Sequence, residues 1–480
     1  METGTGKTDL KLWIAAAAVA GLGTGIMYDA FPGANWGAWT SVAAFGLLPF
    51  SRHAKSPTLV GLAIAASIIA FGAAITASDF LQFLIFVSVI MLLALEMLLS
   101  PNPLIRRLTP TFAVPAPIVA FVSAIIETAR RGSNALQLVR SERARSVLRG
   151  LVITVPVVII FALLLATADP IFARWRDAIE RIITNWEFLP RTIFFFGMLA
   201  IVLGAFGYAS REHAISASPV PAQPPRKWLG ATERLILLAS VAALFWIFLA
   251  VQLSYLFGTH PQVEGSGITF AEYARRGFAE LSVVASASFV LILVSERFGQ
   301  TGRHANALRI ATLAVVVAIL FLLGSAFNRV LLYEQAYGFT TARLYAQAYM
   351  LIVASALVAL GWEIRDILDP ARLFRRIAAI ATLVFIVLLY WNHEAWIANR
   401  NIDRVATTGR LDTAYLTRDL SPNAVPTLVR RLPGIAEPFQ SELKRALIAR
   451  YEKRQHALRN RWFEWNYGRW AAQEALKTIR

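Results

Sequence analysis

The sequence contains no cysteine, and only 16% of its 480 residues are charged. Without cysteine the chain can form no disulfide, use no thiol in catalysis and bind no metal through thiolates. The histidines never stand three or four residues apart, so we expect no metal site and no cofactor. Soluble chains have about a quarter of their residues charged, so the low charge also argues against a soluble protein.

A short glycine-rich stretch, GTGKT at 4–8, matches the end of a phosphate-binding loop. The first glycine of that motif would fall on Met1, and no strand precedes it. The run that follows is too apolar for a helix beneath a solvated phosphate. We therefore interpret the stretch as a chance match and predict no nucleotide site.

Long apolar blocks dominate the remainder of the sequence. Hydrophobic residues make up 57% of the chain, and the mean hydropathy is +0.55. The blocks alternate with short connections that hold most of the charges, which is the pattern of a polytopic α-helical membrane protein. The net charge of +17 would also suit nucleic acid, but the basic residues lie in the connections, where they act as topology signals. We therefore predict an all-α integral membrane protein whose partner is the lipid bilayer, with no nucleic acid.

Eleven segments are apolar enough to be membrane-spanning helices, since about 20 such residues cross a bilayer. They lie near 11–28, 36–50, 58–77, 80–99, 151–168, 191–209, 232–257, 279–295, 306–327, 342–362 and 374–391. The segment 36–50 is short. The stretch 111–126 is also short and contains Pro115 and Pro117, so we predict a re-entrant or interfacial segment there.

The distribution of basic residues predicts the orientation of these spans. With the N-terminus in the cytoplasm, most lysines and arginines of the connections lie inside, including the cluster at 130–149. The connections predicted outside carry only Arg174, Arg176, Arg181, Arg275, Arg276 and Arg329. A further span at 111–126 would move the cluster outside, against the positive-inside rule. The odd number of spans places the C-terminus outside.

Four regions follow from this topology. They are a four-helix membrane region (1–99), a basic cytoplasmic or interfacial connection (100–150), a seven-helix membrane region (151–392) and a helical C-terminal domain outside (393–480). The first span also fits a signal peptide, but a multi-span chain favours a retained helix. Residues 129–149 resemble a helix lying on the acidic inner leaflet. In the last region Trp462, Trp465 and Trp470 either form a core or lie at the lipid interface.

Motifs gather in the segments predicted outside. ADPIF at 168–172, YARRGFAEL at 273–281, YGFTTARLY at 337–345, and NIDR, LDTAYL, NAVP and WNYGRW in the tail occur in this order. In these motifs the chain resembles a family of bacterial polytopic membrane proteins, the domain of unknown function numbered four-one-seven-three. The resemblance runs from roughly the fifth span to the C-terminus. It implies a bacterial inner-membrane protein with its C-terminus in the periplasm, and it supplies no reaction.

The stretch EYARRGFAEL at 272–281 places opposite charges along one helix face. Glu272, Arg276 and Glu280 follow one another at intervals of four, and Arg275 is three residues from Glu272. The simpler interpretation is a self-neutralising ladder at a helix start. The alternative is that Arg275 or Arg276 points into a cavity and binds a phosphate or carboxylate through its planar guanidinium.

Further candidates for ligand binding lie in the other motifs. Arg343 and Tyr345 stand near the start of the tenth span, where a charge is costly unless it is paired, hydrated or extended to the interface. Asp169 precedes a proline, which is typical of a turn; otherwise it is a general base or a partner of Arg343 or Arg276. Arg404 belongs to the motif NIDR.

Three classes of function fit this layout. We rank first a non-catalytic component, in regulation or assembly, that binds an anionic lipid, a small molecule or a membrane-protein partner at its outer face, because the charges gather at that rim. An enzyme acting on a lipid-linked donor is the alternative, since Asp29 in the first outer loop and the outer tail resemble the layout of membrane glycosyltransferases. A transporter ranks third because it needs polar, broken helices at mid-depth, and the one carboxylate within a predicted span, Glu96, lies near the inner end.

Overall fold

The computed structural model describes residues 3–105, 108–137, 150, 154, 188–211, 227–257, 270–300, 302–365, 368–455 and 461–479. Within these ranges the backbone alone is described for 3–9, 134–137, 188, 253–257, 270–279, 303 and 451–455. The described chain is helical and holds no named strand. Nine of its helices are long and apolar enough to cross a membrane.

The helices of the membrane region and of its interface come first along the chain. They are α1 (Thr3–Met27), α2 (Ala34–Leu47), α3 (Pro57–Ile75), α4 (Asp79–Leu99), α5 (Pro110–Ala113), α6 (Ala116–Gln137), α9 (Phe188–Ala209), α10 (Ala231–Phe257), α11 (Phe270–Phe298), α12 (Ala305–Tyr337), α13 (Thr341–Glu363) and α14 (Pro370–Tyr390). The tail holds α15 (His393–Thr408), α16 (Val425–Arg431), α17 (Phe439–Gln455) and α18 (Tyr467–Lys477). Short 3-10 or π turns connect several of these helices.

Local sequence explains where these helices begin and end. Pro370 is the first residue of α14, and the Asp369 carboxylate accepts hydrogen bonds from the amides of Ala371 at 2.9 Å and Arg372 at 3.2 Å. Helix α12 ends at Tyr337, and the next residue, Gly338, has a positive φ of 88°, which glycine adopts readily because it has no Cβ atom. Between such signals the apolar runs satisfy their backbone groups within the helix, as a bilayer requires.

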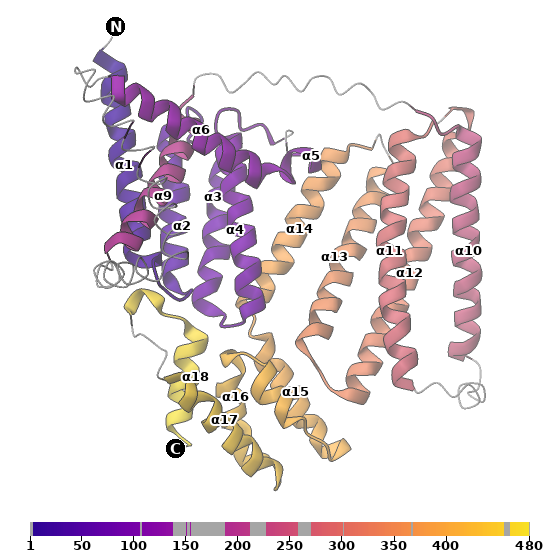
Figure 1. Cartoon of the computed structure of the whole chain (residues 1–480). Coiled ribbons are helices and arrows are strands. Elements are labelled where there is room, and N and C mark those ends of the chain that lie inside the picture. Colours follow the sequence, from indigo (N-terminus) through magenta and orange to yellow (C-terminus); the bar gives the residue numbers. More distant parts are fainter. Residues whose placement is uncertain are drawn as a thin grey trace, which may run out of the picture.

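The helices define two faces of the molecule (Figure 1). The N-terminal face holds the start of α1 and, lying across the helix ends, α6. The C-terminal face is the opposite one, against which the C-terminal region (residues 393–479) packs. Helices α1, α3, α10, α12 and α14 run towards the C-terminal face, whereas α2, α4, α9, α11 and α13 run back.

The predicted all-α membrane fold is confirmed, and the individual spans agree with it to different degrees. The short segment 36–50 is α2 followed by a 3-10 turn at Leu48–Phe50, and α2 is too short to be counted among the nine. Apart from residue 154, the segment 151–168 lies outside the described residues, so the total of eleven stays a prediction. Helix α12 continues ten residues beyond the predicted end at 327, to Tyr337.

The predicted re-entrant or interfacial stretch at 111–126 forms α5 and the first half of α6. Helix α6 continues to Gln137, so it also takes in the start of the segment 129–149; residues 138–149 lie outside the described part. The exposed side of α5 and α6 is apolar, with side chains between 42% and 72% exposed. These side chains are Val114, Ile118, Val119, Phe121, Val122, Ile125 and Ile126. A helix with such a side, lying across the ends of membrane helices, fits the membrane interface.

The C-terminal region has its own apolar core. Buried side chains from α15, α16, α17 and α18 meet there, among them Ile397, Leu428, Leu443 and Ala472. Trp462, Trp465 and Trp470 take no part in it, since Trp462 is 83% exposed and the other two are nearly half exposed. The alternative of a tryptophan core is therefore wrong, and an interfacial position remains for these rings.

Helices α6 and α9 cross at a glycine, which gives a first prediction. A Cβ atom added at Gly204 would lie 2.0 Å from the carbonyl oxygen of Ala124, whereas one added at Gly197, on the same helix, would meet nothing within 4 Å. We expect Gly204→Ala to force the helices apart and to lower the free energy of unfolding by about 1–3 kcal/mol. Gly197→Ala is the control; equal thermal stability of the two variants in detergent would contradict the close crossing.

Candidate functional site

The loop between α12 and α13 holds the motif YGFTTARLY and one of the predicted site residues. Thr340 caps α13, its hydroxyl oxygen accepting a hydrogen bond from the amide of Arg343 at 3.4 Å. The Arg343 guanidinium turns back onto the loop, where it donates to the carbonyl of Gly338 and lies 4.2 Å from the ring centroid of Tyr333. Arg343 is therefore held by its own loop through a hydrogen bond and a cation–π contact.

Helix α15 brings the motif NIDR onto the same loop. The Asn401 amide pairs with both backbone groups of Phe339, accepting from N and donating to O, each at 2.8 Å. Arg404 donates to the last carbonyls of α12, those of Ala336 at 2.8 Å and Gln335 at 3.3 Å. A guanidinium at a helix C-terminus satisfies carbonyls that have no partner within the helix and meets the negative end of the dipole.

Three arginines, Arg343, Arg404 and Arg410, lie near one another where α15 meets the loop between α12 and α13, which we call the arginine junction. Burial lowers the pKa of the Arg404 guanidinium, and the nearby Arg343 and Arg410 lower it further. Among the described residues, no carboxylate lies within 4.0 Å of these three guanidiniums. Buried Glu334 is near enough to attract Arg343, but its own hydrogen bond, at 2.8 Å, comes from Gln347. The Nε–H of Arg404 is buried and has no hydrogen-bond partner in the described part of the chain.

Tyr345, the next predicted residue, belongs to a buried polar network. Its hydroxyl lies 3.1 Å from Nε2 of His393, whose Nδ1 faces the Trp391 carbonyl at 3.2 Å. Nδ1 therefore carries the hydrogen and Nε2 accepts from the tyrosine. Burial lowers the pKa of His393 and raises that of the adjacent Glu394, whose carboxylate accepts from the amide and hydroxyl of Ser421. Since these groups are buried and use one another as partners, the network is structural.

A second set of contacts holds the tail against the end of α3. The Asn466 amide donates to the carbonyls of Ala73 at 2.7 Å and Thr76 at 2.8 Å. The Asn423 amide accepts from the amide of Ala77 at 3.1 Å and donates to the Thr76 hydroxyl at 3.0 Å. Both asparagines are buried. They belong to the motifs NAVP and WNYGRW, so these two motifs attach the tail to the end of α3.

The same tail reaches the loop between α1 and α2. The amide of Ala34 donates to the carbonyl of Trp465 at 2.9 Å, and the Arg469 guanidinium donates to the carbonyl of Pro32 at 2.6 Å. Arg461 donates to the backbone carbonyl of Asp29 at 3.1 Å, and its guanidinium lies 3.7 Å from the Asp29 carboxylate. Asp29, on which the glycosyltransferase analogy depends, is thus engaged in docking the tail.

Four of the remaining predicted site residues lie on α11. Glu272, Arg275 and Arg276 fall within the helix, as expected, but their side chains lie outside the described part, as does Asp169. Glu280 is exposed. Of the predicted set the structure brings together Arg343 and Arg404, with Tyr345 two residues from Arg343 on α13.

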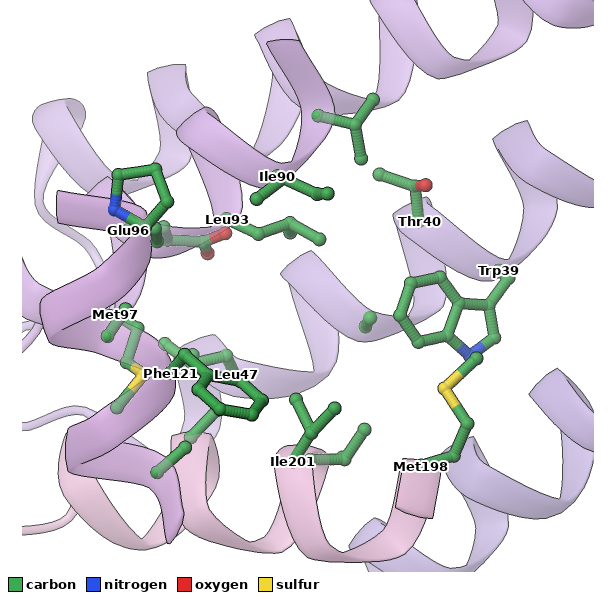
Figure 2. Close-up of a pocket in the computed structure, with 18 of the residues that line it drawn as sticks. Trp39, Thr40, Leu47, Ile90, Leu93, Glu96, Met97, Phe121, Met198 and Ile201 are labelled. Carbon is green, nitrogen blue, oxygen red and sulfur yellow. The ribbon is translucent and has the colours of Figure 1, made fainter. Parts of the chain in front are cut away.

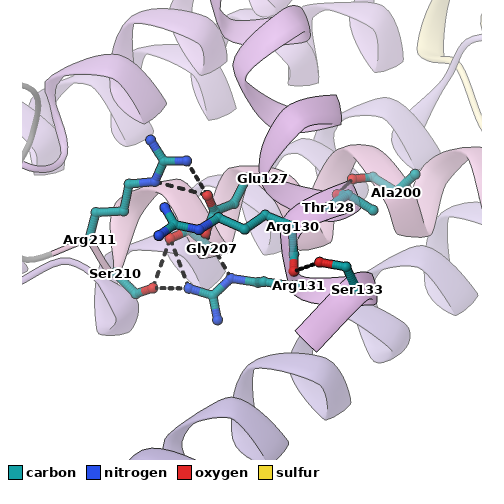
Figure 3. A network of polar contacts seen from close by, with 9 residues as sticks. All are labelled: Glu127, Thr128, Arg130, Arg131, Ser133, Ala200, Gly207, Ser210 and Arg211. Carbon is teal, nitrogen blue, oxygen red and sulfur yellow. Dashed lines mark hydrogen bonds and ion pairs between the residues drawn. The ribbon is translucent and has the colours of Figure 1, made fainter. Parts of the chain in front are cut away.

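Sequence reasoning missed the ion-paired carboxylates of the N-terminal face. Glu127 on α6 accepts from Arg131 at 2.9 Å and from Arg211 beyond the end of α9 (Figure 3). Glu363 pairs with Arg372 and Arg376, and Glu296 with Arg234. The Glu127–Arg131 pair lies within α6, whereas the pairs of Glu363 and Glu296 each join two helices and the Glu127–Arg211 pair ties α6 to the end of α9. The signal in the sequence was present, since every one of these glutamates stands near basic residues of a predicted inner connection.

Groups of three or more histidine, aspartate or glutamate side chains that could hold a metal ion do not occur in the described part of the chain. Three arginines lie where the tail meets the loop between α12 and α13, and ion pairs lie at the opposite face. The chain is thus a polytopic helical membrane protein whose polar residues join its helices to one another and to its tail.

The chain matches the family described as Domain of unknown function (DUF4153) over residues 62–431, and it belongs to this family. No curated protein and no solved structure matches the chain. A family of unknown function is what the motifs led us to expect, but its number is 4153 rather than the one expected. The match also begins earlier, within α3, and ends before the motif WNYGRW.

Proposed function

We propose that this protein is a non-catalytic component of a bacterial inner membrane that binds an anionic ligand at its C-terminal face, in a regulatory or assembly role. The observation that carries the proposal is the convergence of Arg343, Arg404 and Arg410 at one junction, with no described carboxylate within 4.0 Å. A phosphate or carboxylate group would relieve the repulsion among the three cations. It would also accept a hydrogen bond from the Nε–H of Arg404, which has no partner among the described residues.

The position of the arginines supports a regulatory role. Arg404 and Asn401 belong to the C-terminal region, whereas Arg343 belongs to the membrane helices, so one ligand would touch both sides of the junction. A ligand that binds the docked arrangement better than the undocked one shifts the population towards docking.

Orientation belongs to the same proposal. The N-terminus is cytoplasmic and the C-terminal face periplasmic, supported by the basic residues at the helix ends of the N-terminal face. These include Arg52, Lys55, Arg211, Arg297, Arg365, Arg375 and Arg376. The regions bounded at 99, 150 and 392 are likewise our proposal.

Arg410→Gln tests the ligand site, because the Arg410 side chain adds charge and makes no described docking bond. Pyrophosphate is titrated into the full-length protein in neutral-lipid nanodiscs. We expect it to bind the variant at least about tenfold more weakly than wild type, because one charge-assisted hydrogen bond is lost. Lys444→Gln on α17 removes the same charge from an exposed position and should leave the affinity unchanged. Equal affinity in wild type and Arg410→Gln, or no binding to wild type, would reject the proposal.

A further inference from the structure

A cavity of about 380 Å³ lies between α1, α2, α4, α6 and α9 (Figure 2). Aromatic and aliphatic side chains form nearly all of its wall. Among its lining residues are Trp36, Phe86, Phe121, Met198 and Phe206. Its size falls within the range of small-molecule sites, and its lining favours an apolar occupant.

One carboxylate interrupts this apolar wall. Glu96 on α4 is fully buried, and neither of its carboxylate oxygens has a hydrogen-bond partner among the described residues. Figure 2 shows the carboxylate directed towards the cavity beside Leu93. An acidic group buried in a membrane without a partner is costly, so the site lacks a donor.

The cavity is elongated along the membrane helices. Along α4 its wall runs from Phe86 to Met97, a rise of about 16 Å. Glu96 lies at the end near the N-terminal face, while Met27 and Trp36 line the end nearer the C-terminal face. A polar group at one end of a narrow apolar space matches a molecule with a polar head and an alkyl chain.

The mouth of the cavity faces the bilayer. Several of its lining residues keep between 40% and 56% of their surface exposed, and they lie on the membrane helices α4 and α9 and on α6. They are Phe86, Ile90, Phe121 and Ile201. Because exposed side chains at this depth meet lipid tails, an occupant would enter sideways from the membrane.

We propose that this cavity binds a membrane-borne amphiphile with a cationic amine head, the amine pairing with Glu96 and the alkyl chain occupying the apolar part. A protonated amine supplies both the charge and the donors that the carboxylate lacks. The site is independent of the arginine junction, so the failure of either proposal leaves the other standing.

Retention of dodecylamine by the full-length protein in phosphatidylcholine nanodiscs, followed by native mass spectrometry, tests the site. We expect wild type to retain dodecylamine about tenfold better than dodecanol, which has the same chain without the charge. Glu96→Gln should abolish this preference, and Ile90→Trp, at the exposed mouth, should lower retention of both. Glu233→Gln, which changes an exposed glutamate on α10, should behave as wild type.

A second arm replaces dodecylamine with phosphatidylethanolamine in the nanodisc. Retention that depends on Glu96 in this arm identifies a lipid headgroup as the source of the amine, and retention of dodecylamine alone identifies a single-chain amine. Equal retention of dodecylamine by wild type and Glu96→Gln, or equal retention of dodecylamine and dodecanol by wild type, would overturn the proposal.

Discussion

Glu127→Ala is expected to lower the free energy of unfolding by about 3–5 kcal/mol, the largest effect of any single substitution considered. Glu127 is 3% exposed, and its carboxylate receives Arg131 from its own helix and Arg211 from beyond α9 (Figure 3). Without it, two largely buried guanidiniums lose the anion between them. Arg131 would keep its hydrogen bonds to Ser210 at 2.8 Å and to the Gly207 carbonyl at 3.2 Å, which offset only part of the loss.

Denaturant unfolding of the purified protein in detergent measures this effect. Glu474→Ala is the control, because Glu474 forms an exposed ion pair with Lys477 that is worth about 1 kcal/mol or less. Glu127→Gln should lie between the two, since it keeps an acceptor oxygen and loses the charge. If Glu127→Ala were no less stable than Glu474→Ala, the cluster would not join α6 to α9.

The double variant Asn423→Ala/Asn466→Ala is expected to release the C-terminal region from the membrane helices. Each asparagine fixes backbone or side-chain groups within 73–77, and each substitution leaves some of these buried groups without partners, at a cost of about 1–3 kcal/mol. The two side chains share Thr76, so their effects will not be strictly additive.

Limited proteolysis reports the release. We expect cleavage within 393–479 to become at least about tenfold faster in the double variant, because the open state grows with the lost docking energy. The control is Gln473→Ala on α18, an amide that makes no hydrogen bond with a described residue. An unchanged cleavage rate in the double variant would show that other contacts are sufficient for docking.

These results would bear on how the family motifs are understood. In most of the motifs whose side chains are described, the polar groups are engaged with the backbone of another segment: Asn401 with Phe339, Asn466 with Ala73 and Thr76. The motifs thus describe how the tail is attached to the membrane helices. Arg404 serves this attachment as well, whereas Arg343 is held by its own loop, and the proposed ligand site uses the charge that remains.

The sequence alone determined that this is a helical membrane protein in which the connections between spans differ in their content of basic residues. Insertion into a bilayer depends on the composition of each segment by itself, so α3, α4 and α10 can be read from their own residues. The resemblance carried by ADPIF, YARRGFAEL, YGFTTARLY and the tail motifs also led to a family of unknown function. The segment 111–126 was correctly separated from the spans, because its length and prolines are local properties.

Only the tertiary structure decided what the polar residues do. Asn466 and Ala73 are far apart in sequence, and no periodicity or charge count announces their hydrogen bond. Glu96 lies near the inner end of its predicted span, where a carboxylate could reach water, yet α6 crosses that end and the carboxylate is fully buried. A hydrogen bond or a cavity needs residues from several segments, and their partnership is fixed by packing rather than by the composition of any one of them.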